Sequence, residues 1–98
     1  MLTIENTYKL IGRSITIKGY PFRIVTFIET PNDYTIGIED FGTAHAPITV
    51  LLWKKANSDG TYTLQRVKGT YSVCHLPIDA LKDPNQFLFE LQMYLNSF

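Results

Sequence analysis

Cysteine and histidine are the residue types in this chain best suited to catalysis, and they occur side by side as Cys74 and His75. Thiolate catalysis requires an imidazole within reach of the sulfur atom. Neighbouring residues of a regular strand point to opposite faces, so in a strand these two side chains form neither a dyad nor a joint metal pair. His45 lies in a separate predicted loop and serves Cys74 only if the fold brings them together. We interpret Cys74 as a buried free cysteine that packs as a small hydrophobic side chain.

The remaining polar residues show no spacing typical of a catalytic or metal site. One cysteine and two scattered histidines do not supply the four ligands of a zinc site. In a strand, the side chains of Glu39 and Asp40 point to opposite faces. Asp79 and Asp83 fit helix capping better than general acid–base catalysis. The sequence contains neither a phosphate-binding glycine loop nor a nucleophile elbow. We therefore expect a protein that is not an enzyme and binds no metal or cofactor.

A predicted β-hairpin carries the most distinctive surface in the sequence. Ile48–Lys55 and Thr61–Lys68 flank the turn Asn57–Gly60, and pairing of Ala56 with Thr61 sets the register. One face of the hairpin then gathers aromatic, apolar and basic side chains. They are Leu51, Trp53, Lys55, Tyr62, Leu64, Arg66 and Lys68. We predict Trp53, Lys55, Tyr62, Leu64, Arg66 and Lys68 as the binding residues.

This hairpin face has two functional interpretations and one structural alternative. Trp, Tyr and Arg are enriched at protein-binding hot spots, and single-stranded nucleic acid binders also interleave aromatic and basic groups. The local charge agrees with both, since residues 50–76 hold four Lys or Arg and one Asp. In the alternative, Trp53 and Leu64 belong to the core and the cations form a solvated rim. A slip of one residue in register would exchange the cross-strand partners, so the patch depends on the loop length.

The elements that position these residues follow from a shift in composition. Of the 25 Thr, Ile and Val residues, 24 lie before residue 78, and β-branched side chains favour strands. We predict a single domain, 1–98, with a β-rich body at 1–77 and a C-terminal helix at 78–98 packed on the sheet. Residues 4–11 fit either a short strand or helical turns. Period-two alternation predicts strands at Arg13–Lys18, Phe22–Glu29, Tyr34–Asp40, Ile48–Lys55, Thr61–Lys68 and Thr70–Leu76.

Two of these elements carry specific local signals. The second predicted strand places Phe22, Ile24, Thr26 and Ile28 on one face, and Gly37 in the third predicted strand indicates a bulge or sharp bend. Asp83 suits the N-cap of the helix, with Pro84 at its first position and Gln86 near a capping box. The apolar stripe that packs on the sheet is Phe87, Leu88, Leu91, Leu95 and Phe98. Phe89 and Met93 lie at the edge of that stripe, or form a partner surface.

Length and charge limit the class of protein further. The chain has 98 residues, enough for one domain, and its nine Lys plus Arg balance nine Asp plus Glu. That balance excludes a globally basic nucleic-acid binder, and one cysteine excludes a disulfide framework. The longest apolar run, Val50–Trp53, is far shorter than the ~20 residues of a membrane span. The N-terminus lacks the pattern of a signal peptide, so we expect a cytoplasmic protein.

Residues 12–77 resemble small SH3-like or OB-like barrels through the runs GRSITIKGYPFRIVTFIE and YTIGIEDFG. The acidic and aromatic ligand loop of a signalling SH3 domain is missing, so no functional residue is carried over. The predicted fold class is α+β, mostly β. It is a five- to six-stranded antiparallel bent sheet, or a small SH3/OB-like barrel, with a C-terminal α-helix.

For function, we expect a non-catalytic protein-binding module that acts through the hairpin face. It is an adaptor, an assembly subunit or a compact inhibitor from a phage or mobile element. Two alternatives stay open: a nucleic-acid-binding small barrel, and a small-molecule-binding or catalytic barrel that uses Cys74, His45 or His75. Six Tyr, six Phe and one Trp in a chain of zero net charge also permit a homo-oligomer.

Overall fold

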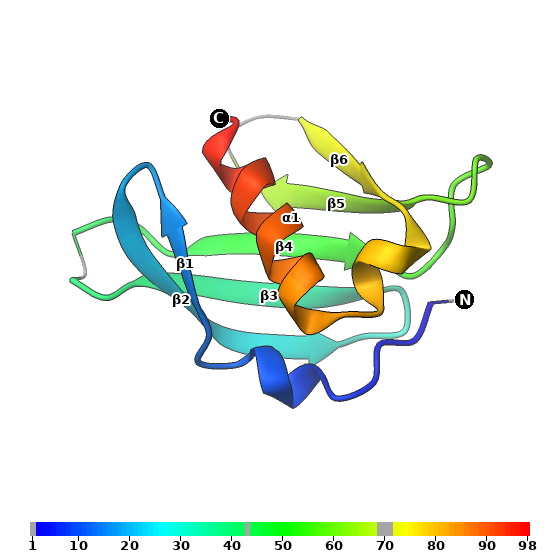
Figure 1. Cartoon of the computed structure of the whole chain (residues 1–98), viewed down its shortest axis with the longest axis horizontal. Coiled ribbons are helices and arrows are strands. Elements are labelled where there is room, and N and C mark those ends of the chain that lie inside the picture. Colours follow the sequence, from blue (N-terminus) through cyan, green and yellow to red (C-terminus); the bar gives the residue numbers. More distant parts are fainter. Residues whose placement is uncertain (1, 43, 69–71) are drawn as a thin grey trace.

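Six strands form one antiparallel sheet in which every strand pairs with its neighbour in sequence, in the order β1 to β6. The computed structural model describes residues 2–42, 44–68 and 72–98. The sheet curls into a half-barrel, and the C-terminal helix lies on its concave side (Figure 1). The elements are η1 (Thr7–Leu10), β1 (Ser14–Ile17), β2 (Tyr20–Glu29), β3 (Asp33–Asp40), β4 (Ile48–Trp53), β5 (Tyr62–Val67), β6 (Val73–Leu76), η2 (Ile78–Leu81) and α1 (Pro84–Asn96).

This architecture confirms the predicted fold class, in its form of an open bent sheet with a C-terminal helix. Each predicted strand is present, with ends that differ by a few residues; Thr70 and Tyr71 of the last one lie outside the described residues. The ambiguous N-terminal segment forms the short 3-10 helix η1. In the described part of the chain, no helix has the length and apolar character needed to cross a membrane.

The core lies between the concave side of the sheet and the inner face of α1. Alternate strand residues point into it, so Ile36 and Ile38 of β3 and Val50 and Leu52 of β4 are fully buried. Leu91 of α1 is also fully buried on the other side of this layer. Period-two alternation in the strands and the helical stripe therefore meet in one hydrophobic cluster.

A β-bulge in β2 changes which of its side chains reach the core. The register of β2 on β3 shifts between Ile24 and Thr26, so Thr26 lies opposite Gly37. Beyond the bulge Phe27 is buried while Thr26 and Ile28 are exposed. The prediction that Thr26 and Ile28 share the face of Phe22 and Ile24 is therefore wrong, because the extra residue reverses the alternation. The bulge itself agrees with the bend indicated by Gly37.

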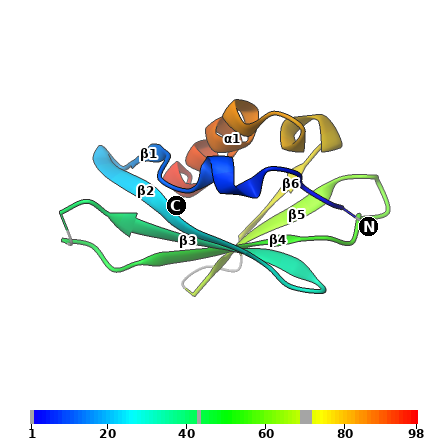
Figure 2. The ribbon, with the colours of Figure 1, turned by 90° about the horizontal axis from the view of Figure 1, so that it is seen from below.

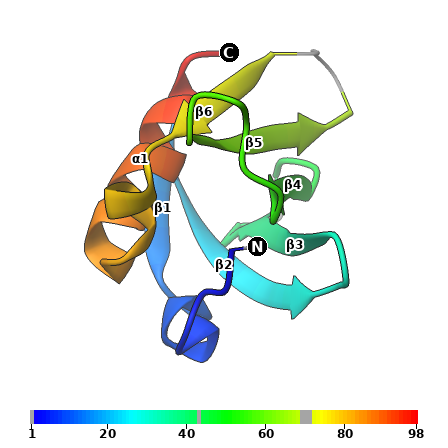
Figure 3. The ribbon, with the colours of Figure 1, turned by 90° about the vertical axis from the view of Figure 1, so that its right-hand side faces the viewer.

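Helix α1 begins as predicted and closes one edge of the sheet. The Asp83 carboxylate accepts a hydrogen bond from the Asn85 N–H at 3.0 Å, and Pro84 occupies the first turn. At the other end of the helix, the Thr16 N–H donates to the Gln92 side chain at 2.7 Å. Asn96 accepts from the Lys18 N–H at 2.7 Å and donates to the Thr16 carbonyl at 2.8 Å. Figure 3 shows β1 beside the helix, whose side-chain amides take the place of a neighbouring strand.

Candidate interaction surface

The convex side of the sheet has no helix or further strand over it in the part of the chain that the structure describes (Figure 2). A row of paired residues crosses it from β2 to β6: Ile28 pairs with Thr35, Thr35 with Leu51, Leu51 with Gln65, and Gln65 with Val73. We call this surface the open face. It comprises Ile28, Thr35, Thr49, Leu51, Trp53, Thr63, Gln65, Val67 and Val73.

The open face is unusually apolar for a surface that water contacts. Ile28, Val67 and Val73 are 55%, 38% and 44% exposed. Leu51 and Trp53 are half-buried among their neighbours. The other members are threonine and glutamine, so no charged side chain lies inside the patch, and such patches typically mark interaction sites.

Trp53 is held in place on the open face by a side-chain hydrogen bond. Its indole N–H donates to the amide oxygen of Gln65 at 3.2 Å. This contact reaches from the end of β4 to the middle of β5 and leaves the apolar ring at the surface. A half-buried indole with its polar atom satisfied offers a large contact area at low cost in conformational entropy.

The predicted hairpin face is not assembled, because the register differs by one residue. Leu52 pairs with Leu64 and Val50 with Arg66, whereas the four-residue turn required Trp53 opposite Leu64. Strand β4 ends at Trp53 and β5 begins at Tyr62, and their pairing ends at Leu52 and Leu64. The connection is therefore longer than the predicted turn and does not set that register. Trp53 therefore lies on the open face, while Tyr62, Leu64 and Arg66 lie on the side that α1 covers.

The predicted basic residues are also separated from Trp53 and from one another. Arg66 stacks its guanidinium on the Phe98 ring, 5.3 Å from the centroid. Lys55 is exposed in the connection after β4, and Lys68 follows β5 with a left-handed backbone (φ 70°). Lys54 is buried and forms an ion pair with Glu29 beneath the end of the sheet. The aromatic and basic components of the prediction thus occupy different places.

Cys74 and His75 point to opposite sides of the sheet, as expected for strand neighbours. Cys74 pairs with Leu64 on the helix side and His75 with Thr63 on the side of the open face. Burial raises the pKa of the Cys74 thiol, and the negative charge of Glu90 raises that pKa further. A raised thiol pKa reduces the thiolate fraction that a nucleophile requires. The register confirms that these strand neighbours point to opposite faces.

The sequence interpretation missed a contact between Asp40 and His45. The buried Asp40 carboxylate is 2.6 Å from Nδ1 of His45 and accepts a second hydrogen bond from the Gly42 N–H at 2.8 Å. The hydrogen bond from His45 makes the largest contribution to a lowered pKa of Asp40, and the bond from Gly42 lowers that pKa further. The imidazole also lies against Tyr20, with 4.4 Å between ring centroids. Asp40 follows Ile38 by two residues, so the strand alternation that turns Ile38 inward also turns Asp40 inward. A buried carboxylate requires a partner, and this alternation was the signal in the sequence.

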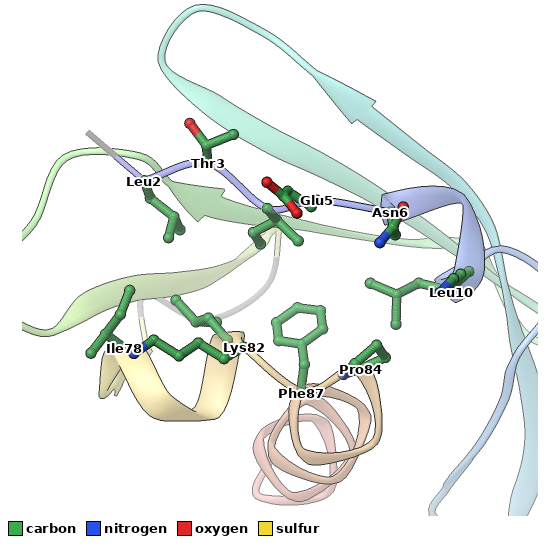
Figure 4. Close-up of a pocket in the computed structure, with 12 residues that line it drawn as sticks. Leu2, Thr3, Glu5, Asn6, Leu10, Ile78, Lys82, Pro84 and Phe87 are labelled. Atoms are coloured by element: carbon green, nitrogen blue, oxygen red, sulfur yellow. The ribbon is translucent and has the colours of Figure 1, made fainter.

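A pocket of about 390 Å³ opens on the helix side of the molecule, between residues 2–10 and the start of α1 (Figure 4). We call it the N-terminal pocket. Its floor is apolar and its rim carries Glu5, Lys9 and Lys82. Neither histidine and not Cys74 lines it. Among the described residues, no three His, Cys, Asp or Glu side chains gather as a metal site would require.

Comparison of the chain with protein-family models, curated proteins and solved structures finds no match. The open face and the N-terminal pocket are therefore the features of the molecule that bear on its function.

Proposed function

We propose that this protein is a non-catalytic protein-binding module that docks its open face against an apolar surface of a partner protein. The observation that supports this is the row from Ile28 to Val73, which crosses β2 to β6 without a charged side chain. Interface centres are depleted in charged residues. Ile28 and Val73, at the two ends of the row, are exposed, so contact with a partner removes apolar surface from water.

Trp53 serves as the anchor of the proposed interface. Its ring flanks the row beside Leu51, and the bond to Gln65 holds it before any partner binds. Tryptophan is among the residues that dominate binding energy when they are central and desolvated. A preformed rotamer reduces the entropy lost on association.

The rim of the open face favours a protein over a nucleic acid. Asp33 pairs with Trp53 in the ladder, and Glu39 pairs with Arg23 beyond the row. Acidic groups therefore accompany the arginine at the rim, while Arg66 stacks on Phe98 under the helix. A phosphate backbone requires a groove of cations. A partner with apolar side chains at its centre and mixed polar groups around them fits better.

The size of the open face fits the centre of a modest interface. Strand spacing of ~4.8 Å and a rise of ~3.4 Å per residue give a footprint of roughly 400 Å² across β2 to β6. Standard interfaces bury about 800 Å² of accessible surface per partner. The open face supplies the apolar centre and the surrounding loops supply the remainder. Such a module acts as an adaptor, an assembly subunit or a compact phage-type inhibitor in the cytoplasm.

The experiment replaces the centre of the open face with a charge and compares it with a matched surface change. Leu51→Lys places an ammonium in the middle of the row, and Trp53→Ala removes the anchor. Met93→Lys makes the same type of change on the outer face of α1, where Met93 is 55% exposed. Proteins captured on each variant from its source cells are quantified by mass spectrometry. The recovered partner is then purified and titrated directly.

We expect Leu51→Lys and Trp53→Ala to weaken binding of the purified partner by about tenfold or more, and Met93→Lys to leave it unchanged. Affinity should change little between low and high salt, because few charges are neutralised. Equal binding by Leu51→Lys and the wild type would place the interface elsewhere. Loss of the captured material on nuclease treatment would favour nucleic acid, and capture of only the same chain would make the partner a second copy.

A further inference from the structure

One wall of the N-terminal pocket is formed by residues 2–6, which are hydrogen-bonded toward the sheet at Leu2 and Ile4. The Leu2 N–H donates to the Lys54 carbonyl at 2.9 Å, and the Ile4 N–H donates to the Tyr34 hydroxyl at 2.7 Å. The facing wall consists of η2 and the first turn of α1. Different parts of the fold therefore hold the two walls of the pocket in place, and a space remains between them.

The floor of the N-terminal pocket is apolar and continuous with the core. Leu2, Leu10, Leu81 and Phe87 line it and are each at most 7% exposed. Figure 4 shows Leu10 and Phe87 directed into the space from opposite walls. The volume of about 390 Å³ lies within the range of small-molecule sites, which are mostly apolar with few polar groups. A ligand with an apolar body would bury that body against this floor.

The shape of the pocket favours an elongated body. Leu2 and Ile78 lie at one end of it, Leu10 and Pro84 lie at the other, and Phe87 stands between them (Figure 4). The segment Leu2–Asn6 forms one wall along this length, which an extended chain of that size limits to roughly 16 Å. An unbranched hydrocarbon chain fits an elongated space of this length with an apolar floor.

The charges on the rim favour an anionic head group. The pocket residues include two cations, Lys9 and Lys82, and one carboxylate, Glu5. Lys82 is already paired with Asp79 at 3.6 Å. Lys9 takes part in none of the ion pairs found among the described residues. It lines the pocket and directly precedes Leu10, which lies at one end of the floor. It is therefore the cation best placed to meet a carboxylate whose apolar chain lies along the floor.

We propose that the N-terminal pocket binds a medium-chain fatty acid, with the hydrocarbon chain over Phe87 toward Ile78 and the carboxylate at Lys9. The ion pair with Lys9 is exposed to solvent and gives direction more than affinity. Burial of the chain supplies most of the affinity. This site lies on the helix side of the sheet and does not depend on the open face or on its partner.

The experiment titrates sodium decanoate, below its micelle concentration, into the full chain labelled with ¹⁵N. We expect saturable shifts of the backbone amides of Leu2, Leu10, Leu81 and Phe87, and none around Leu51. Ile78→Phe fills the end of the pocket at a residue that is 38% exposed, and it should weaken binding about tenfold. Decanol, which lacks the charge, should bind roughly fivefold more weakly than decanoate.

Charge reversal tests the head-group position with a matched control. Lys9→Glu should weaken decanoate binding by roughly fivefold. Lys55→Glu changes the net charge equally at an exposed residue outside the pocket, and it should leave the affinity unchanged. Absence of saturable shifts at the pocket amides would overturn the proposal. Equal binding of decanoate and decanol, or equal effects of Lys9→Glu and Lys55→Glu, would overturn the assignment of the carboxylate to Lys9.

Discussion

The hydroxyl of Tyr94 accepts a hydrogen bond from the backbone N–H of Arg66 at 2.9 Å, at the point where β5 and β6 separate. The same hydroxyl donates to the carbonyl of Ser72 at 2.5 Å. Tyr94 lies on α1, so one helical side chain bridges two backbone groups that a longer ladder would have paired directly. The helix therefore completes the sheet at β6, as Gln92 and Asn96 complete it at β1.

Removal of this bridge should destabilise the protein. Tyr94→Phe keeps the buried ring and leaves the Arg66 N–H and the Ser72 carbonyl without their partner. Both hydrogen bonds are part-buried, and each contributes about 0.5–1.5 kcal/mol. We therefore expect the free energy of unfolding in urea to fall by about 1–3 kcal/mol. Tyr8→Phe changes a side chain that is 67% exposed and should stay within about 0.5 kcal/mol of the wild type. Equal stability of both variants would show that water replaces the hydroxyl.

The bulge in β2 leads to a prediction about Gly37. A Cβ atom at Gly37 would lie 2.3 Å from the Thr26 hydroxyl oxygen, far closer than atoms approach without a shift. Gly37→Ala should therefore lower the free energy of unfolding by about 1–3 kcal/mol, the usual cost of overpacking. Thr26→Ala removes that oxygen, so the double variant should recover most of the loss.

A control variant and a double-mutant cycle test the Gly37 prediction. The nearest neighbour of an added Cβ at Gly42 is an Asp40 oxygen at 3.6 Å, an ordinary contact, so Gly42→Ala should be nearly neutral. A double-mutant cycle on Gly37 and Thr26 should show a coupling energy of at least about 1 kcal/mol. Additive effects of the two substitutions would contradict the close approach as the cause.

The strands and the helix could be predicted because their signals are local. Alternation over a few residues identified each strand, and Asp83 with Pro84 identified the start of α1. The sequence indicated the bulge only in part. Gly37 indicated a distortion in β3, but the extra residue lies in the paired strand β2, and one strand's sequence does not show the register of its partner.

The candidate surface was harder to predict because its register depends on distant contacts. The β4–β5 pairing ends at Leu52 and Leu64. Beyond it, the Lys54 N–H donates to the Asn32 carbonyl at 3.0 Å and its carbonyl accepts from Leu2 at 2.9 Å. With Leu52 opposite Leu64, Trp53 and Arg66 lie on opposite faces of the sheet. Neither contact has a signature within the hairpin. Trp53 was found as a surface residue by its type, whereas its neighbours on the open face required the sheet.

The Asp40–His45 contact predicts how stability depends on pH. The pKa of Asp40 is lowered in the folded protein, chiefly by the hydrogen bond from His45. The unfolded chain therefore binds more protons in the acidic range, and unfolding free energy rises with pH there. The stabilisation is present above the unfolded carboxyl pKa of about 3.9 and is lost as the pH falls through the lower folded value. Asp40→Asn should flatten this slope.

The slope is measured by urea unfolding of wild type and variants from neutral pH into the acidic range. Asp59 contributes with the same sign, since hydrogen bonds from Thr61 also lower its pKa, so Asp59→Asn should flatten the curve as well. The double variant should lose more of the slope than either single change. A wild-type slope in Asp40→Asn would show that the contact with His45 does not favour the ionised form in solution.

The amides that close the β1 edge predict how the protein avoids association through that strand. Gln92 and Asn96 occupy the outward backbone groups of Thr16 and the N–H of Lys18. Exposed strand edges with unpaired backbone groups recruit other strands. Gln92→Ala combined with Asn96→Ala should therefore raise the apparent mass in size-exclusion chromatography with light scattering, increasingly with protein concentration.

The matched control for this edge is Gln86→Ala, on the same helix. Gln86 is exposed and its side chain donates only to Glu90 at 3.1 Å, so its loss exposes no strand. If both variants kept the mass of the wild type at high concentration, Gln92 and Asn96 would not be what prevents association through β1. Association by the double variant alone would assign that role to Gln92 and Asn96. A further substitution, Thr16→Pro, should then suppress the association, because it removes an edge N–H that a second strand would use.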